Sequence, residues 1–89
     1  MVWRVEFEAD ADREMQRLGG AVSARIAKYL RTRLATSENP RRFGQPLRAD
    51  LHGYWRYRVG DYRVIARIIE DRVLVLVVRV GHRKDVYDF

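Results

Sequence analysis

The chain has 89 residues, 47% of them hydrophobic and 34% charged, which is enough for one small folded domain and excludes a disordered chain. No apolar run approaches the roughly 18 residues of a membrane-spanning helix, so a transmembrane protein is excluded. The chain has no cysteine and only two histidines, His52 and His82, so we expect no disulfide, no metal and no other cofactor. The N-terminus carries no export pattern, so we expect a cytoplasmic protein.

The charge of the chain is positive and is carried mostly by arginine. Eighteen basic residues against 12 acidic ones give a net charge of +6, and 16 of the 18 are arginine. Residues 41–89 hold 11 basic and 6 acidic groups, so the positive charge is concentrated in the second half. The guanidinium group is planar, permanently charged and suited to phosphate. The charge therefore indicates a nucleic acid or an acidic protein as partner, with a merely soluble basic domain as the alternative.

The first half of the chain predicts one strand followed by a helical hairpin. Apolar and charged residues alternate over Trp3–Glu8, which is typical of a half-buried strand. A short helix follows, with Asp10 expected at its N-cap, and it ends at Gly19 and Gly20. A second helix is predicted over residues 21–35, because apolar residues recur there every four positions.

The second half predicts a meander of strands. In residues 36–46 the apolar residues recur with neither helical nor strand spacing. The segment contains Ser, Asn, Pro and Gly, so we predict a loop. Three strand-like runs follow at 54–59, 62–69 and 73–80, separated by gaps of hairpin length. The chain therefore predicts a single α+β domain over residues 1–89 in the order β-α-α-β-β-β. We expect a mainly antiparallel four-stranded sheet with the helical hairpin packed on one face.

The first strand of the predicted meander places two arginines on one face of the sheet. Arg56 and Arg58 alternate with Trp55, whose side is the better candidate for the core, so both arginines should project from the open side. Arg63 begins the next strand across a tight turn, and we expect it near Arg58.

Such a face has two interpretations that the spacing alone leaves open. Arginines rimmed by Tyr54, Tyr87 and His82 would form a site for a phosphodiester whose bases stack on aromatic rings. The alternative is a solvated face whose arginines pair with acidic residues of the strand connections, namely Asp61, Glu70 and Asp71.

Two segments of the second half carry a specific pattern of residues. The first, Gly53–Ile65, reads GYWRYRVGDYRVI, and the second, Val80–Tyr87, reads VGHRKDVY. Together with Pro46-Leu47-Arg48 and the order of elements, these segments resemble the RelE toxins of the RelE/ParE superfamily. The resemblance covers nearly the whole chain and implies the same α+β fold.

The resemblance implies the toxin of a type II toxin–antitoxin system, a small basic endoribonuclease that cleaves mRNA in the ribosomal A site. In that reaction the ribose 2′-hydroxyl attacks the adjacent phosphate and no metal is required. The implied partners are the ribosome, mRNA and a RelB-like antitoxin in a hetero-oligomer, with no membrane. We expect the antitoxin to pack on the apolar rim of the helical hairpin and to cover part of the cationic face.

The resemblance also implies roles for individual residues. Arg63 matches a phosphate-binding arginine of the family, and Arg83 matches an arginine proposed as general acid or phosphate clamp. Tyr87 matches a tyrosine that stacks on or orients a base. The implied catalytic residues are Arg56, Arg58, Arg63, Arg83 and Tyr87. RNA-binding positions are expected around them at Tyr54, His82, Lys84 and Arg48.

The sequence leaves the general base and the exact target open. Some family members carry a lysine on the strand of Arg56 and Arg58, and one such lysine is suggested as the base, but arginine has a pKa of about 12.5 or above and does not readily release a proton. The remaining candidates are His82, Lys84 with a lowered pKa, or no protein base at all. Two other functions remain: inhibition of DNA gyrase by a ParE-type toxin of the same fold, and a catalytically inactive homologue that only binds antitoxin or DNA.

Overall fold

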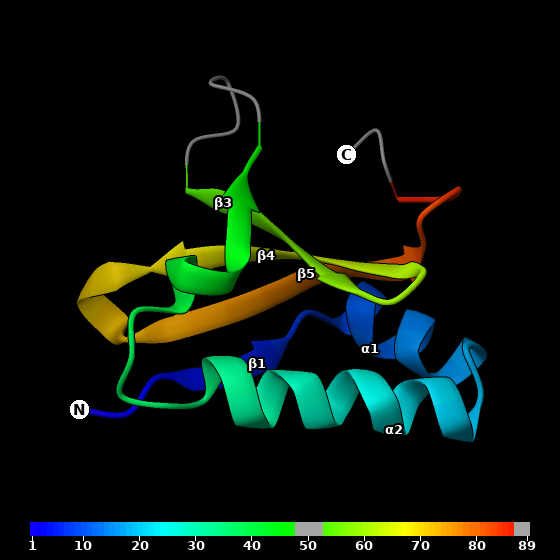
Figure 1. Cartoon of the computed structure of the whole chain (residues 1–89), viewed down its shortest axis with the longest axis horizontal. Helices are drawn as coiled ribbons and strands as arrows, with labels where there is room; N and C mark the ends of the chain where they lie inside the picture. Colours follow the sequence, from blue (N-terminus) through cyan, green and yellow to red (C-terminus); the bar gives the residue numbers. More distant parts are fainter. Residues whose placement is uncertain (48–52, 87–89) are drawn as a thin grey trace.

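The computed structural model describes residues 1–47 and 53–86. A strand is followed by two helices and then by a meander of strands (Figure 1). The helices and turns are α1 (Ala9–Arg17), α2 (Gly20–Tyr29), the π-helical turn η1 (Leu30–Leu34) and the 3-10 turns η2 (Pro40–Phe43) and η3 (Glu70–Arg72). The strands are β1 (Arg4–Phe7), β2 (Gly44–Pro46), β3 (Tyr54–Val59), β4 (Tyr62–Ile69) and β5 (Leu74–His82).

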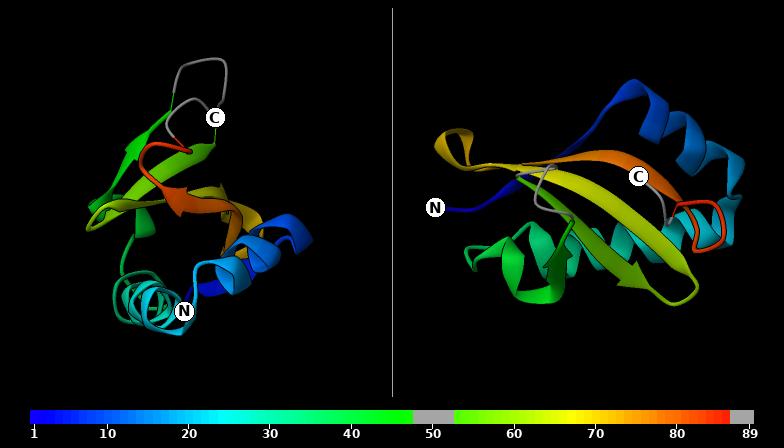
Figure 2. Two further views of the ribbon diagram at one scale, coloured as in Figure 1. Left: turned by 90° about the vertical axis from the view of Figure 1, so that its right-hand side faces the viewer. Right: turned by 90° about the horizontal axis from the view of Figure 1, so that it is seen from above.

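The five strands form one mixed sheet in the order β1-β5-β4-β3-β2. β1 and β5 are parallel, and the other neighbouring strands are antiparallel. Both helices cover the same face of this sheet (Figure 2). The α+β class and the one-sided helical layer are therefore as predicted, whereas the strand number is five rather than four.

The additional strand, β2, lies in the segment predicted as a loop. Gly44–Pro46 pairs with β3 at the edge of the sheet, where a proline is tolerated because one side of the strand needs no partner. A Cβ atom at Gly44 would lie 2.8 Å from Cε1 of Tyr57 and 3.2 Å from the carbonyl oxygen of Arg56. Gly44 therefore permits the close approach of β2 to β3.

The helices differ from the prediction at their ends. α1 begins at Ala9 with Glu8 at the N-cap, so the expected cap at Asp10 is wrong. Asp10 lies instead in the first turn, where it pairs with Arg13 and faces the positive end of the helix dipole. The second predicted helix ends as η1 rather than as a regular α-helix. In residues 1–47 and 53–86, no helix is both long and apolar enough to cross a membrane.

The main core lies between the two helices and the sheet. Ile26 and Leu34 from the helical layer pack with Val75 and Val77 of β5 in one apolar cluster. Tyr57 of β3 is fully buried in this cluster, and its hydroxyl donates a hydrogen bond to the carbonyl oxygen of Pro40 at 2.7 Å. The side of β3 that carries Trp55 and Tyr57 therefore faces the core, as expected, and Arg56 and Arg58 lie on the open face.

The open face of the sheet also carries a small apolar cluster. The pairing of β4 with β5 shifts between Ile65 and Ala66, which leaves Val78 as an extra residue at a β-bulge. Val78, Ile65 and Val86 are buried together, and Tyr54 packs against them. Ile65 is paired with Arg56 across the strands, so the cluster adjoins the basic residues of this face.

Candidate phosphate site

The β3–β4 hairpin positions three arginines of the site. Arg58 of β3 is directly opposite Arg63 of β4, and Arg56 lies two residues before Arg58 on the same face. Gly60 and Asp61 form the connecting turn, and Gly60 has a φ of 60°, a conformation that favours glycine at this first turn position. The predicted proximity of Arg58 and Arg63 is confirmed.

Arg83 follows β5 and is held against the same turn. Its backbone N–H donates to the carbonyl oxygen of Asp61 at 2.8 Å. Gly81, two residues earlier, is paired with Arg63, and a Cβ at Gly81 would lie 2.6 Å from Cγ2 of Val86. The close packing of this backbone brings Arg83 to the end of the hairpin that carries Arg63.

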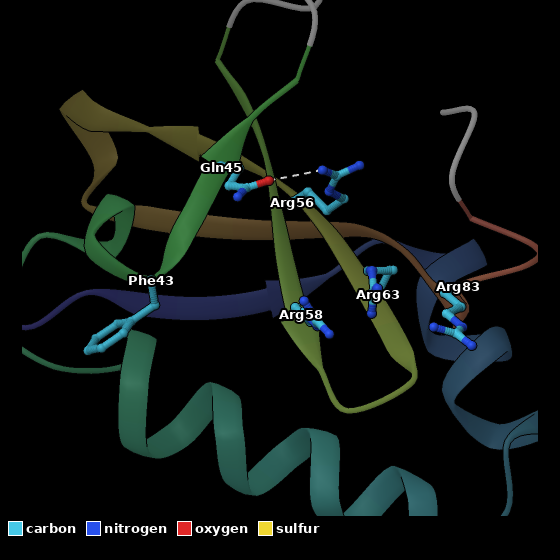
Figure 3. A pocket seen from close by; sticks show the side chains of 6 residues that line it. All are labelled: Phe43, Gln45, Arg56, Arg58, Arg63 and Arg83. Atoms are coloured by element: carbon cyan, nitrogen blue, oxygen red, sulfur yellow. Dashed lines mark hydrogen bonds between the residues drawn. The ribbon is translucent and has the colours of Figure 1, made fainter.

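These arginines line one hollow on the open face, which we call the arginine pocket. It has a volume of about 490 Å³. Figure 3 shows the four arginines around it, with Phe43 at the side away from Arg83. Its lining residues are Phe43, Gln45, Arg56, Arg58, Arg63 and Arg83.

Two of the arginines are oriented by hydrogen bonds to neutral groups. Arg56 donates from Nη2 to Oε1 of Gln45 at 3.0 Å. Arg63 donates from Nη1 to the carbonyl oxygens of Gly60 and Tyr62, at 3.1 and 3.0 Å. Neither guanidinium group pairs with a carboxylate of residues 1–47 or 53–86, so both charges can interact with an anion.

Among the described residues, carboxylates pair with arginines elsewhere on the surface but not with those of the pocket. Within residues 1–47 and 53–86, ion pairs join carboxylates to Arg4, Arg13, Arg41, Arg42 and Arg79, and none joins a carboxylate to a pocket arginine. Glu70, which the sequence offered as a partner for the basic face, pairs with Arg41 instead. The described part of the chain therefore does not support the interpretation of a neutralised sheet face.

The pocket is a region of mutual repulsion between like charges. The pKa of Arg63 is lowered, first by burial and then by the positive charges of Arg58, Arg56 and Arg83, while Asp61 opposes the effect. A bound anion would relieve this repulsion, and a guanidinium group can offer two parallel N–H donors to a phosphate. Four guanidinium groups around one hollow could therefore bind a phosphate or a phosphodiester.

Three further residues expected at the site lie outside the arginine pocket. Tyr54 is half-buried against the small apolar cluster of the open face. His82 lies in a separate hollow, with its ring edge-on to Tyr62 at a centroid distance of 5.5 Å and Nδ1 accepting the backbone N–H of Lys84 at 3.2 Å. Lys84 is exposed on the turn after β5. Arg48 and Tyr87 lie outside the described residues.

Two residues of the pocket, Phe43 and Gln45, were not predicted as site residues. Both lie in the segment that the sequence predicts as a loop, and β2 brings Gln45 beside Arg56. Phe43 is 40% exposed, and the guanidinium groups of Arg33 and Arg42 each lie 5.3 Å from its ring centroid. The sequence signal for this feature is an aromatic residue directly after two arginines in an apparently irregular segment.

Comparison with known proteins agrees with the arrangement of the fold and the site. Residues 2–87 match the family model described as the ParE toxin of the type II toxin–antitoxin system parDE. The chain is 34% identical over 87 residues to the toxin RelG of Mycobacterium tuberculosis, with 98% of each protein covered. It is 29% identical over 85 residues to the mRNA interferase toxin RelE of Escherichia coli, with 94% of this chain and 86% of that protein covered.

The similarity extends to a solved structure. The chain superimposes with a TM-score of 0.83 on a chain of the crystal structure of the toxin–antitoxin complex RelBE2 from Mycobacterium tuberculosis. The two chains are 31% identical, and the match covers 93% of each. The RelE-like fold implied by the sequence is thereby confirmed.

Proposed function

Since the chain belongs to the RelE/ParE superfamily of type II toxins, we propose that it is an endoribonuclease that cleaves mRNA in the ribosomal A site. The arginine pocket carries this proposal. It gathers four arginines without a carboxylate partner among the described residues, and arginine is a residue with which proteins contact nucleic-acid phosphates. The name of the Escherichia coli relative, an mRNA interferase, supports the same activity.

The proposed reaction is an attack by the ribose 2′-hydroxyl on the adjacent phosphorus. A bond forms from the 2′-oxygen to phosphorus and the bond to the 5′-oxygen breaks, which leaves a cyclic phosphate and a free 5′-hydroxyl. The 2′-hydroxyl loses one proton and the 5′-oxygen gains one. Negative charge accumulates on the phosphoryl oxygens in the transition state, and fixed guanidinium groups stabilise it there.

We assign different roles to the four arginines according to their exposure and hydrogen bonds. Arg56 and Arg63 are half-buried and oriented by hydrogen bonds, so we assign them to holding the phosphoryl oxygens. Arg58 and Arg83 are exposed at either side, and we assign them to neutralising the charge that develops. Tyr87 remains our proposed base-orienting residue, and Tyr54, His82, Lys84 and Arg48 remain proposed RNA contacts.

The geometry of His82 argues against its role as general base. A neutral imidazole that accepts a hydrogen bond at Nδ1 carries its proton on Nε2, so His82 offers a donor rather than an acceptor to solvent in this arrangement. We therefore assign most of the rate to charge stabilisation by arginine and to positioning of the RNA by the ribosome.

We also propose a RelB-like antitoxin as the partner that holds the toxin inactive. The similar solved chain belongs to a toxin–antitoxin complex. An acidic segment of such a partner would fit the positive charge of the arginine pocket, and the helical hairpin would supply apolar contact. Co-purification from the native operon should yield a small acidic protein, and its absence would contradict this assignment.

Inhibition of DNA gyrase is the second candidate function, because the family model that matches the chain is that of the ParE toxins. This function would depend on a protein contact rather than on phosphodiester cleavage. A supercoiling assay with purified gyrase distinguishes the two functions, since the nuclease should leave gyrase activity unchanged.

Expression of substituted toxins tests the role of the pocket. The pair Arg63→Ala and Arg83→Ala should abolish growth arrest, because it removes two of the four positive charges at the proposed phosphate site. Arg72→Ala serves as the control, since Arg72 is an exposed arginine on η3 outside the pocket. Undiminished growth arrest in the folded double variant would contradict the nuclease proposal.

A further inference from the structure

A second basic hollow lies on the other side of Arg58 from the arginine pocket. It has a volume of about 350 Å³ and runs between α2 and the β3–β4 turn. We call it the α2 groove; the polar side chains that line it are Arg25, Lys28, Tyr29, Thr32, Arg33 and Arg58. Since Arg58 lines both hollows, a ligand in the arginine pocket lies at the entrance of the α2 groove.

The basic residues of the groove, like those of the pocket, pair with no carboxylate of the described residues. Residues 20–35 contain four basic side chains and no acidic one. Within the parts of the chain that the structure describes, Arg25, Lys28 and Arg33 form no ion pair, whereas five arginines elsewhere do. The positive electrostatic potential of the pocket therefore continues along α2.

The turn of the hairpin connects the two hollows physically. A Cβ atom at Gly60 would overlap the guanidinium group of Arg25, so Arg25 packs directly on the glycine of the β3–β4 turn. Tyr29 lies half-buried in the groove, and its hydroxyl, which is neutral at neutral pH as in tyrosine generally, can donate a hydrogen bond. Exposed cations beside a neutral hydroxyl are the groups that proteins use to contact nucleic-acid backbones.

We propose that the α2 groove is a second RNA-backbone site, which binds phosphates of the same strand whose scissile phosphate occupies the arginine pocket. The assignment rests on the proposed function and extends it to a longer stretch of substrate. RNA fits better than an acidic peptide because the pocket and the groove share Arg58, and a strand with regularly spaced phosphates can occupy both at once. The two hollows would then confer affinity that grows with the length of the RNA.

Binding of uncleavable RNA of two lengths tests the proposal. The two ligands are a trinucleotide and a decanucleotide, both 2′-O-methylated so that 2′-hydroxyl attack cannot cut them. Their dissociation constants are measured by fluorescence anisotropy over a range of salt concentrations. The double variant Arg25→Gln/Lys28→Gln should bind the decanucleotide roughly tenfold more weakly and the trinucleotide as the wild type does. For the decanucleotide, the logarithm of the binding constant falls linearly with the logarithm of the salt concentration. The magnitude of this slope should be smaller by about 1.4 in the double variant, as expected for two lost contacts to single-stranded RNA.

The control variant is Arg13→Gln/Arg72→Gln, which removes the same charge from exposed positions outside both hollows. Its decanucleotide affinity should stay within about twofold of the wild type, because screening weakens distant charges. An equal loss in both variants, or an unchanged preference for the longer RNA in the groove variant, would overturn the proposal. A groove variant that loses affinity only for a polyglutamate peptide would also overturn it and would assign the groove to an acidic protein.

This test is independent of catalysis. A toxin that shows the predicted length dependence but cuts no message would contradict the proposed nuclease and leave the groove assignment intact. A toxin that cuts message while its groove variant keeps full affinity for the decanucleotide would support the proposed nuclease and contradict the groove assignment.

Discussion

Arg58 and Arg63 are paired directly across β3 and β4, so that two like charges face each other on one side of the sheet. Arg63 has a lowered pKa partly because of this neighbour. Like charges in directly opposite positions destabilise a strand pair. The candidate site therefore carries an electrostatic cost in the free protein that a phosphate can relieve.

Removal of one of these charges should stabilise the free toxin. We expect Arg58→Gln to raise the free energy of unfolding by about 0.2–1 kcal/mol, with the larger gain at low salt. Arg67→Gln is the matched control, because Arg67 is an exposed arginine of β4 whose cross-strand neighbour is the uncharged Tyr54. Urea denaturation at two salt concentrations measures both variants. A loss of stability in Arg58→Gln, or an equal gain in the control, would contradict the account of repulsion.

The glycine of β2 should tolerate no side chain. A methyl group at Gly44 would press on the ring of Tyr57, so Gly44→Ala should lower stability by about 1–3 kcal/mol. Gly20→Ala is the control, because a Cβ at Gly20 meets nothing within 4 Å and alanine favours the helix. Thermal denaturation should show a lower midpoint for Gly44→Ala and an equal or higher one for Gly20→Ala. A stable Gly44→Ala variant would mean that β2 does not pack as described.

Tyr57 should contribute to stability in a pH-dependent manner. Tyr57→Phe leaves the Pro40 carbonyl without its donor, which should cost about 1–3 kcal/mol at neutral pH. Burial raises the pKa of Tyr57 above its ordinary value of 10.0. The unfolded chain therefore ionises first, and the stability contributed by Tyr57 is present below that value and decreases as the pH rises above it.

Urea denaturation at neutral pH and above the ordinary tyrosine pKa checks this sign. The wild type should lose more stability between the two conditions than Tyr57→Phe does. Equal losses in the two proteins would show that the hydroxyl of Tyr57 is not the group responsible.

Glu14 of α1 should stabilise the part of β5 that follows its pairing with β1, where Val80 lies. Its Oε1 accepts the backbone N–H of Val80 at 2.8 Å, and its Oε2 accepts from Nε of Arg79 at 3.3 Å. Glu14→Ala removes both acceptors and should lower the free energy of unfolding by about 1–3 kcal/mol. Glu14→Gln keeps an oxygen for the N–H of Val80 and should recover most of the loss in the same denaturation assay. A glutamine variant as unstable as the alanine variant would assign the effect to charge instead.

The arginine face follows from local sequence pattern. Alternation along β3 fixes which side Arg56 and Arg58 occupy once Trp55 is assigned to the core. The short Gly60–Asp61 turn then determines the register that places Arg63 opposite Arg58. Both steps use only near neighbours in the chain, which explains why they could be predicted.

The other parts of the site depend on contacts between distant segments. β2 has three residues with a glycine and a proline, so it shows no alternation, and its pairing with β3 is set by the close fit of Gly44 against Tyr57. For the same reason Phe43 and Gln45 were not expected in the pocket. The bulge at Val78 likewise has no local signal in an uninterrupted apolar run.

Primer extension on a defined message shows whether the chain cuts mRNA on the ribosome, as we propose. Purified toxin is added to a translating extract and, in a parallel reaction, to the same message without ribosomes. We predict cuts at A-site codons only where ribosomes are present, and no cuts with the Arg63→Ala/Arg83→Ala variant. An intact message in both reactions would contradict the account.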